Sequence, residues 1–234
     1  MKISNNPMLS FTSRNNPVPD FKIKTQKGEL TVKEFTIEDA KNRNDLLGLT
    51  EFFVKGFMSN TEDPKYTQFN NEKNKQGYLY KLNAMADYYG DMFKVDDGNL
   101  TVLVAKDSKG ELAGAVIANT LNEAGVHEKS TCYIDSIAVA QEYRKNKVGQ
   151  ILENKAIECS KDIYQDVFLA SDNLAVGFQL KNGFRILDYT NPAEKRVIDK
   201  INLERCDYPD YITFMDKSIS PSDTPWYERA FKDD

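Results

Sequence analysis

Three cations crowd one junction of this sequence. Arg144, Lys145 and Lys147 lie within four positions, between an apolar run at 133–139 and a helical pattern that begins near Gly149. A helix N-terminus disfavours cations by about 0.3–1 kcal/mol each, because its dipole is positive there. A bound anion would reverse this effect, since the free N–H groups and the cations would then both point at it. The spacing therefore predicts a phosphate-binding loop.

The elements that position this loop follow from hydrophobic periodicity. The predicted strands are 29–35, 99–105, 111–121, 131–139, 166–171, 184–188 and 211–215. The predicted helices are one capped by Thr36 with an apolar stripe to Phe57, one from Tyr78 to near Gly90, one after the basic loop, and two at 173–180 and 192–203. This order predicts an α/β fold, with a mixed, mostly antiparallel twisted sheet flanked by helices.

Residues 29–217 are predicted to form one domain. Residues 1–28 are predicted to be a flexible or loosely packed N-terminal extension, and residues 218–234 a C-terminal tail.

Composition narrows the classes of partner. The net charge of −5 argues against nucleic acid as the main partner. No apolar run approaches the roughly 18 residues that span a bilayer, so no membrane association is expected, and the start of the chain does not resemble a signal peptide.

Cys132, Cys159 and Cys206 are interpreted as reduced thiols of a cytoplasmic protein. A single histidine, His127, excludes a His-rich zinc site, and no metal is expected.

The order of elements and the basic loop together resemble the GCN5-related N-acetyltransferase (GNAT) superfamily over about residues 30–217. The family's loop after its fourth strand has the pattern (Arg/Gln)-x-x-Gly-x-(Gly/Ala). Arg144 and Gly149 match it, whereas Lys147 stands at the first glycine. A helical φ at Lys147, with the ammonium turned outward, would keep the loop able to bind phosphate.

The resemblance implies where acetyl-CoA would bind. The family's loop amides bind the pyrophosphate, which implies the N–H groups of Arg144, Lys145, Asn146, Lys147, Val148, Gly149 and Gln150. The apolar end of the fourth strand pairs with the pantetheine arm, which implies Ile137, Ala138 and Val139.

A second family segment reads Asn-x-x-Ala-x-x-(Phe/Leu)-Tyr-x-x-x-Gly-Phe. Aligned on Gly183, it implies Asn173 and Phe178 as cofactor contacts, although Asp172 falls at the Asn position itself. Gln179 stands at the Tyr, which many relatives use as the general acid. Glutamine does not titrate in the useful range, so that role is vacant or filled from elsewhere.

The implied reaction is acetyl transfer to a primary amine of a small molecule or peptide, by direct attack. It needs a base, which the family's fourth strand often supplies. Asp135 shares a face with Ile137 and Val139 if no bulge intervenes, and is one candidate; otherwise it is a solvent-facing acid or an ion-pair partner. Tyr133 is the alternative, with half-buried packing as its other interpretation.

For several further residues the sequence is compatible with either substrate contact or packing. Ser171 and Asp172 could orient the substrate, and the second helix carries four tyrosines that either border the acceptor pocket or pack in the core: Tyr78, Tyr80, Tyr88 and Tyr89.

A function other than acetyl transfer is also compatible with the sequence. Lys147 and Gln179 favour a non-catalytic GNAT-fold module that binds or senses acyl-CoA. A homodimer is one arrangement that the sequence leaves open.

Overall fold

The structure is a computed structural model that describes residues 18–58, 75–95, 99–121, 128–160, 164–204, 212–220 and 224–230. Their strands form one eight-stranded sheet in the order β1-β2-β3-β4-β5-β6-β8-β7. In chain order the strands are β1 (Phe21–Thr25), β2 (Gly28–Glu34), β3 (Thr101–Lys106), β4 (Leu112–Leu121), β5 (Glu128–Val139), β6 (Asp166–Ser171), β7 (Arg185–Ile186) and β8 (Thr213–Ser218). All neighbouring pairs are antiparallel except β5 and β6, which confirms the predicted mixed, mostly antiparallel sheet.

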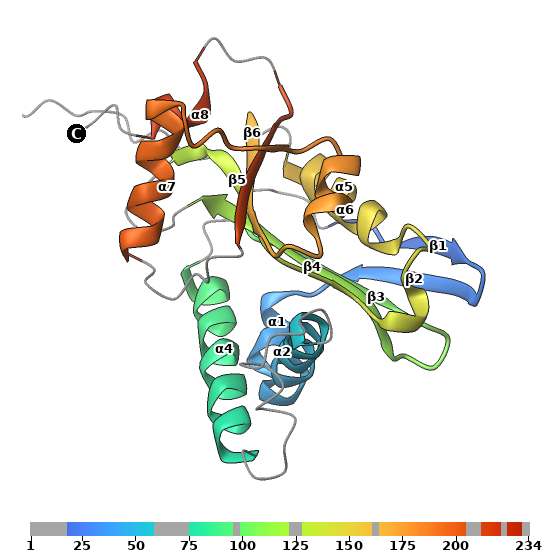
Figure 1. Cartoon of the computed structure of the whole chain (residues 1–234). Helices are drawn as coiled ribbons and strands as arrows, with labels where there is room; N and C mark the ends of the chain where they lie inside the picture. The colour runs from blue at the N-terminus through green and yellow to red at the C-terminus, as the bar shows by residue number, and fades with distance from the viewer. Residues whose placement is uncertain are drawn as a thin grey trace, which may run out of the picture.

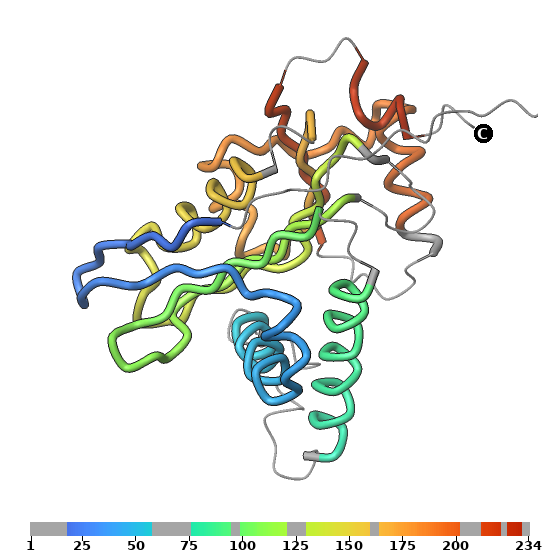
Figure 2. Tube along the Cα trace, turned by 180° about the vertical axis from the view of Figure 1, so that it is seen from behind, coloured from blue at the N-terminus to red at the C-terminus, as the bar shows by residue number. Residues whose placement is uncertain are grey.

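Helices cover both faces of this sheet (Figure 1 and Figure 2). They are α1 (Ile37–Lys41), α2 (Arg43–Met58), α4 (Lys75–Val95), α5 (Val148–Ser160), α6 (Val176–Lys181), α7 (Pro192–Glu204) and α8 (Trp226–Arg229), with a 3-10 turn at Gln141–Tyr143. One buried cluster joins α2 and α4 to β3, β4 and β5, and another joins α5 to the opposite face of the sheet. A third cluster packs α7 and α8 against β6 and β8. Within the described ranges no helix is both long enough and apolar enough to cross a membrane.

Local sequence explains where the first helices start and stop. The Thr36 hydroxyl accepts the N–H of Asp39, while the Asp39 carboxylate accepts the N–H of Thr36, so the predicted cap is a complete capping box. The single helix predicted after Thr36 is in fact two, because Asn42 adopts an extended conformation between α1 and α2.

The predicted end of the second helix at Gly90 is wrong, since α4 continues to Val95. A Cβ at Gly90 would lie 3.3 Å from Cδ2 of Leu46. The glycine therefore lets α4 pack closely against α2 and does not end the helix.

The first hairpin of the sheet corrects the interpretation of residues 18–28 as a loose extension. All five residues of β1 pair with β2, from Phe21 opposite Val32 to Thr25 opposite Gly28. Ile23 is buried in the core cluster that includes α5. The alternating sequence 21–25 forms a strand because its apolar positions cover the end of α5.

The C-terminal segment also packs on the domain. Trp226, in α8, is 1% exposed, and its ring centroid lies 5.1 Å from that of Phe168 in β6. Its indole N–H donates to the Asp216 carboxylate at 2.9 Å. Residues 224–230 are thus part of the domain, although the sequence analysis placed them in the tail. His127 and Cys206 lie outside the described residues, while Cys132 and Cys159 form no disulfide within the described ranges.

Candidate functional site

The central feature of the site is the point where the two parallel strands part. The pairing of β5 with β6 runs from Thr131 opposite Asp166 to Ile134 opposite Leu169. After Ile134, β5 is no longer paired with β6. On its other side β5 stays paired with β4 as far as Val139. One edge of β5, from Asp135 to Val139, is therefore open.

The direction of the backbone at this edge follows from the ladder with β4. The N–H of Ala140 donates to the carbonyl of Ala113 at 3.0 Å, so the polar backbone groups of Ala140 and Ala138 point toward β4. Those of Ile137 and Val139 point the other way, into the open edge. Of the three residues predicted to pair with pantetheine, Ile137 and Val139 lie at this edge.

Ala138 has a different position, since its side chain packs against α2. A Cβ at Gly56 of α2 would lie only 2.8 Å from the Cβ of Ala138, so the glycine allows the helix to approach the strand here.

A β-bulge lies at the point of divergence. Ser136 is opposite Ile117 and Ile134 is opposite Ala118, so Asp135 is an extra residue without a partner position in β4. The expectation that Asp135 shares a face with Ile137 and Val139 is therefore wrong. The bulge turns Asp135 toward α4, whereas Ile137 and Val139 pack on the side of α5.

Two hydroxyl groups bond to the Asp135 carboxylate, and a third bonds to one of these two. The Tyr88 hydroxyl donates to Oδ1 at 2.8 Å, and the Ser136 hydroxyl donates to Oδ2 at 2.8 Å. Behind them, the hydroxyls of Tyr89 and Ser136 are 2.8 Å apart. Burial, followed by the charge of Asp135, raises the pKa of Tyr89 far above its usual range, so this phenol stays protonated. The network holds a half-buried carboxylate in one orientation at the divergence.

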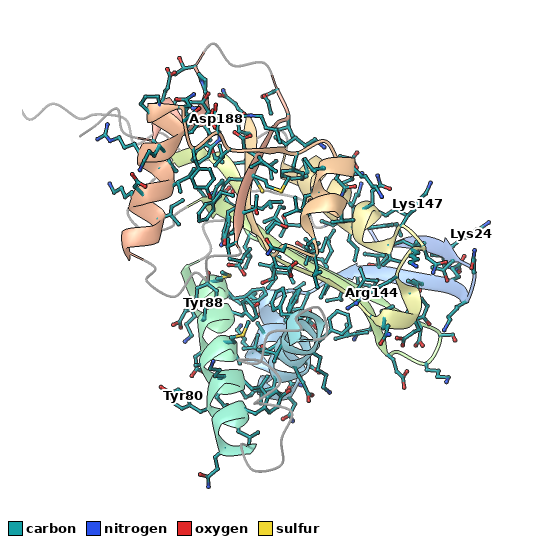
Figure 3. The ribbon with its side chains drawn as sticks, viewed as in Figure 1. Lys24, Tyr80, Tyr88, Arg144, Lys147 and Asp188 are labelled. Atoms are coloured by element: carbon teal, nitrogen blue, oxygen red, sulfur yellow. The ribbon has the colours of Figure 1, made fainter. Side chains whose placement is uncertain are left out.

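The four tyrosines of α4 divide between packing and the site. Tyr89 is buried in the core, and Tyr78 lies 3.4 Å from the Glu51 carboxylate, hydroxyl to oxygen. Tyr80 is 77% exposed and points outward, whereas Tyr88 lies near the sheet (Figure 3). Among the described residues Tyr88 is the tyrosine of α4 that bonds to Asp135.

The basic loop has an unusual backbone. Lys145 and Lys147 adopt positive φ angles of 65° and 63°. The expectation of a helical φ at Lys147 is therefore wrong, because Lys147 takes a left-handed conformation that glycine adopts without strain. The loop keeps this conformation despite the missing glycine.

Side chains within the loop fix this conformation. The Asn146 amide donates to the carbonyls of Tyr143 and Arg144 at 3.3 and 3.1 Å. Nε of Arg144 donates to the Val139 carbonyl at 3.1 Å, which ties the loop to the end of β5. These bonds offset part of the strain of two left-handed lysines.

The helix that follows the loop presents free donors. The N–H of Ile151 bonds to the carbonyl of Lys147 at 2.9 Å, which leaves Val148, Gly149 and Gln150 in the first turn. No acceptor for their N–H groups exists among the described residues. The N-terminus of α5 thus combines free N–H groups with the cations of the loop, as the sequence predicts for an anion site.

The short helix α6 forms a wall beside this loop. A Cβ at Gly149 would lie 3.2 Å from Cγ2 of Val139 and 3.4 Å from Cζ of Phe178, so α5, β5 and α6 meet at this glycine. Asn173 is exposed, and Oδ1 of Asp172 accepts the N–H of Ala175 at 2.8 Å. Asp172 therefore caps a turn that leads into α6.

The other residue considered for orienting the substrate has a local role as well. Ser171, at the end of β6, is buried, and its hydroxyl donates to the carbonyl of Asp172 at 3.1 Å.

Gln179 faces a buried acid that the sequence analysis did not identify. Glu153, on α5, is fully buried, and the Asn182 amide donates to its Oε2. Burial raises the pKa of Glu153 to about 7, although hydrogen bonds from Asn182 and Gln179 and the charge of Lys217 each act to lower this pKa. The only sequence signal is its place four residues after Gly149, on the same side of the helix.

Tyr133 lies in the part of β5 that is still paired with β6, opposite Phe168. It is 3% exposed and stacks on Phe168 with ring centroids 5.8 Å apart, in the cluster that contains Trp226. These contacts favour the packing interpretation. The described residues hold no group of three or more His, Cys, Asp or Glu side chains that could bind a metal ion.

The fold is thus a mixed sheet in which the parallel strands β5 and β6 separate, with a basic loop and the start of α5 at the open edge of β5. The family model of the acetyltransferase (GNAT) family matches residues 58–184, more than half of the 234 residues. The chain belongs to this family, which supports acetyl transfer as its general activity.

Solved structures agree with the fold. The PaiA N-acetyltransferase of Thermoplasma acidophilum, in complex with coenzyme A, has a TM-score of 0.51 at 15% identity, over 81% of this chain and 98% of that chain. A GNAT-family acetyltransferase from Listeria monocytogenes has a TM-score of 0.50 at 13% identity, over 85% of this chain and 100% of that chain. Identities this low concern the fold alone. None of the curated proteins matches the sequence.

Proposed function

We propose that this chain is an acetyl-CoA-dependent N-acetyltransferase that acts on a primary amine of a small molecule or peptide. The observation that carries the proposal is the open edge of β5. It runs from the carboxylate of Asp135 at one end to the free N–H groups of α5 at the other. An extended ligand with an anionic end suits this edge, called the slot below, because its anion would meet the N–H groups of α5 while its other end would lie near Asp135.

Separate groups along the slot would bind the pyrophosphate and the pantetheine arm of acetyl-CoA. The N–H groups of Val148, Gly149 and Gln150, with the cations of the loop, would bind the pyrophosphate. The backbone groups of Ile137 and Val139 that point away from β4 would pair with the amides of the pantetheine arm. When bound, acetyl-CoA supplies an acetyl group that is activated as a thioester.

Asp135 is the proposed base. An amine must lose a proton to form an amide, and the Asp135 carboxylate would accept it directly or through one water. The hydroxyls of Tyr88 and Ser136 keep the carboxylate oriented. Because the bulge turns Asp135 toward α4, the amine would enter from that side. Tyr133 is less suited, since it is buried and stacks on Phe168.

The test is release of CoA thiol with a panel of amines. We expect Asp135→Asn to lower amine-dependent release by about 100-fold or more, the usual contribution of a general base. Binding of acetyl-CoA, followed by thermal shift, should stay unchanged. A matched control is Asp91→Asn, which removes an exposed carboxylate of α4 that pairs with Lys94. Full activity of Asp135→Asn would overturn the role of Asp135.

The non-catalytic module remains the second candidate, because Gln179 is buried and carries no proton to donate in the useful range. This candidate predicts a thermal shift with acetyl-CoA and no thiol release with any amine of the panel. The absence of a shift at millimolar acetyl-CoA would contradict both candidates.

A further inference from the structure

The hairpin of β1 and β2 is joined directly to the basic loop. The N–H of Gln26, in the hairpin turn, donates to Oδ1 of Asn146 at 3.2 Å. The other end of the same amide group bonds to the carbonyls of Tyr143 and Arg144. The Asn146 side chain therefore uses both its acceptor and its donor to connect a segment near the N-terminus with the loop before α5.

The hairpin turn is itself well fixed. Oγ1 of Thr25 accepts the N–H of Lys27 at 3.1 Å and donates to the carbonyl of Gly28 at 2.7 Å. Gly28 has a φ of 125°, which L side chains rarely adopt. Lys27 is thus presented from a turn held by several hydrogen bonds.

This contact brings like charges together. Lys27 is adjacent to Gln26, while Lys145 and Lys147 flank Asn146, and within the described ranges none of the three lysines has an ion-pair partner. The hairpin, the β3–β4 turn and the loop (20–34, 106–111 and 142–147) carry nine cations against six acids, although the whole chain has a net charge of −5. Figure 3 shows Lys24 and Lys147 extending from this end of the molecule.

A cavity of about 320 Å³ borders the same junction. Its lining includes Lys27, Glu29, Asp107, Ser108 and Tyr143. The two acids make the interior unfavourable for a phosphate, and both already have partners: Glu29 pairs with Lys22, and Asp107 accepts the Tyr143 hydroxyl at 3.4 Å. Because the bond between Gln26 and Asn146 holds the neighbouring Lys27 beside the basic loop, a phosphate suits this side of the cavity better.

We propose that the hairpin and the loop together form a second anion site, which binds the phosphate monoester at the 3′ position of the CoA ribose. This proposal rests on the proposed binding of acetyl-CoA. The 3′-phosphate is joined to the pyrophosphate through a single ribose, so it lies within a few bonds of the group assigned to α5. Lys27 would bind it with Lys145, and the interaction of a dianion with two ammonium groups would favour CoA over dephospho-CoA.

Calorimetric titration tests this site without any acetyl transfer. We expect the wild type to bind CoA about tenfold more tightly than dephospho-CoA, and adenosine 3′-phosphate 5′-diphosphate more tightly than ADP, because each pair of ligands differs only by the 3′-phosphate. Lys27→Ala should weaken CoA about five- to tenfold and dephospho-CoA less than about twofold. The exposed position of Lys27 makes this variant compatible with folding, which thermal unfolding would check.

A matched control lies on the same hairpin, far from its turn. Lys33 is exposed on β2, and its ammonium lies 3.1 Å from the Asp20 carboxylate. Lys33→Ala removes the same charge and should change CoA binding less than about twofold, which is the range of a screened, unspecific effect.

Two results would overturn the proposal. One is equal binding of CoA and dephospho-CoA by the wild type. The other is a Lys27→Ala variant that loses as much affinity for dephospho-CoA as for CoA, or that loses no more affinity for CoA than Lys33→Ala does. Failure of the wild type to bind either ligand would instead contradict the proposed function, and this inference with it.

Discussion

Replacing Glu153 with glutamine tests the electrostatics of the contact between α5 and α6. Glu153 is fully buried, and its environment raises the pKa of the carboxyl from 4.5 to about 7. Between these two values the folded protein holds a proton that the unfolded chain has released, so stability falls as the pH rises through this window. Above about pH 7 both states are ionised, and the full cost of the buried charge remains.

The size of this effect follows from the shift. One pKa unit corresponds to about 1.4 kcal/mol, so the wild type should lose on the order of 3 kcal/mol between about pH 4.5 and 7 through this group. Glu153→Gln removes the titration and keeps the shape of the side chain. Its amide can still accept from Asn182, and it gains a donor for Oε1 of Gln179 or Oδ1 of Asn182, which have no hydrogen-bond partner among the described residues.

Urea unfolding at several pH values between 4.5 and 8 gives the free energy of unfolding of both proteins. We expect the difference, variant minus wild type, to grow toward high pH by about 3 kcal/mol. The control is Glu158→Gln on the same helix, whose exposed carboxylate pairs with Lys155 and is worth about 0–1 kcal/mol. Parallel pH profiles of the wild type and Glu153→Gln would refute the reasoning.

Two further predictions concern stability. Lys147→Gly should raise the free energy of unfolding by about 0.5–1 kcal/mol in the absence of ligand, because it relieves the positive φ, and a lower melting temperature would contradict this. Trp226→Ala should lower the free energy of unfolding by about 3–5 kcal/mol, since it empties a buried site against Phe168 and leaves Asp216 without the indole donor. Trp226→Phe keeps most of the packing and should cost less, and a loss near zero for Trp226→Ala in urea would show that α8 does not pack as described.

Much of the sheet could be predicted from alternation alone. The strand β6 begins and ends at the predicted residues, and the hairpin of β3 and β4 differs by one or two residues at its ends. These strands combine buried apolar side chains with clear turn residues. The strand β1 was missed, because a five-residue strand next to Asn- and Pro-rich residues gives a weak signal.

The geometry of the site could be predicted only in part. The place of the basic loop, between a strand and the N-terminus of a helix, follows from the positions of Arg144, Lys147 and Gly149 in the sequence, and its binding of an anion stays a prediction. The bulge at Asp135 depends on the register with β4, and the contact with Tyr88 joins residues 47 positions apart. Local periodicity contains neither kind of information.

The most direct test of the account follows backbone amide signals by NMR as CoA is added. Binding at the start of α5 predicts that the largest shifts occur at Val148, Gly149 and Gln150, together with Ile137 and Val139 at the open edge of β5. The signals of α7, at the other end of the sheet, should change little. Saturable shifts at these five amides would support the proposed slot, and unchanged signals there at millimolar CoA would contradict it.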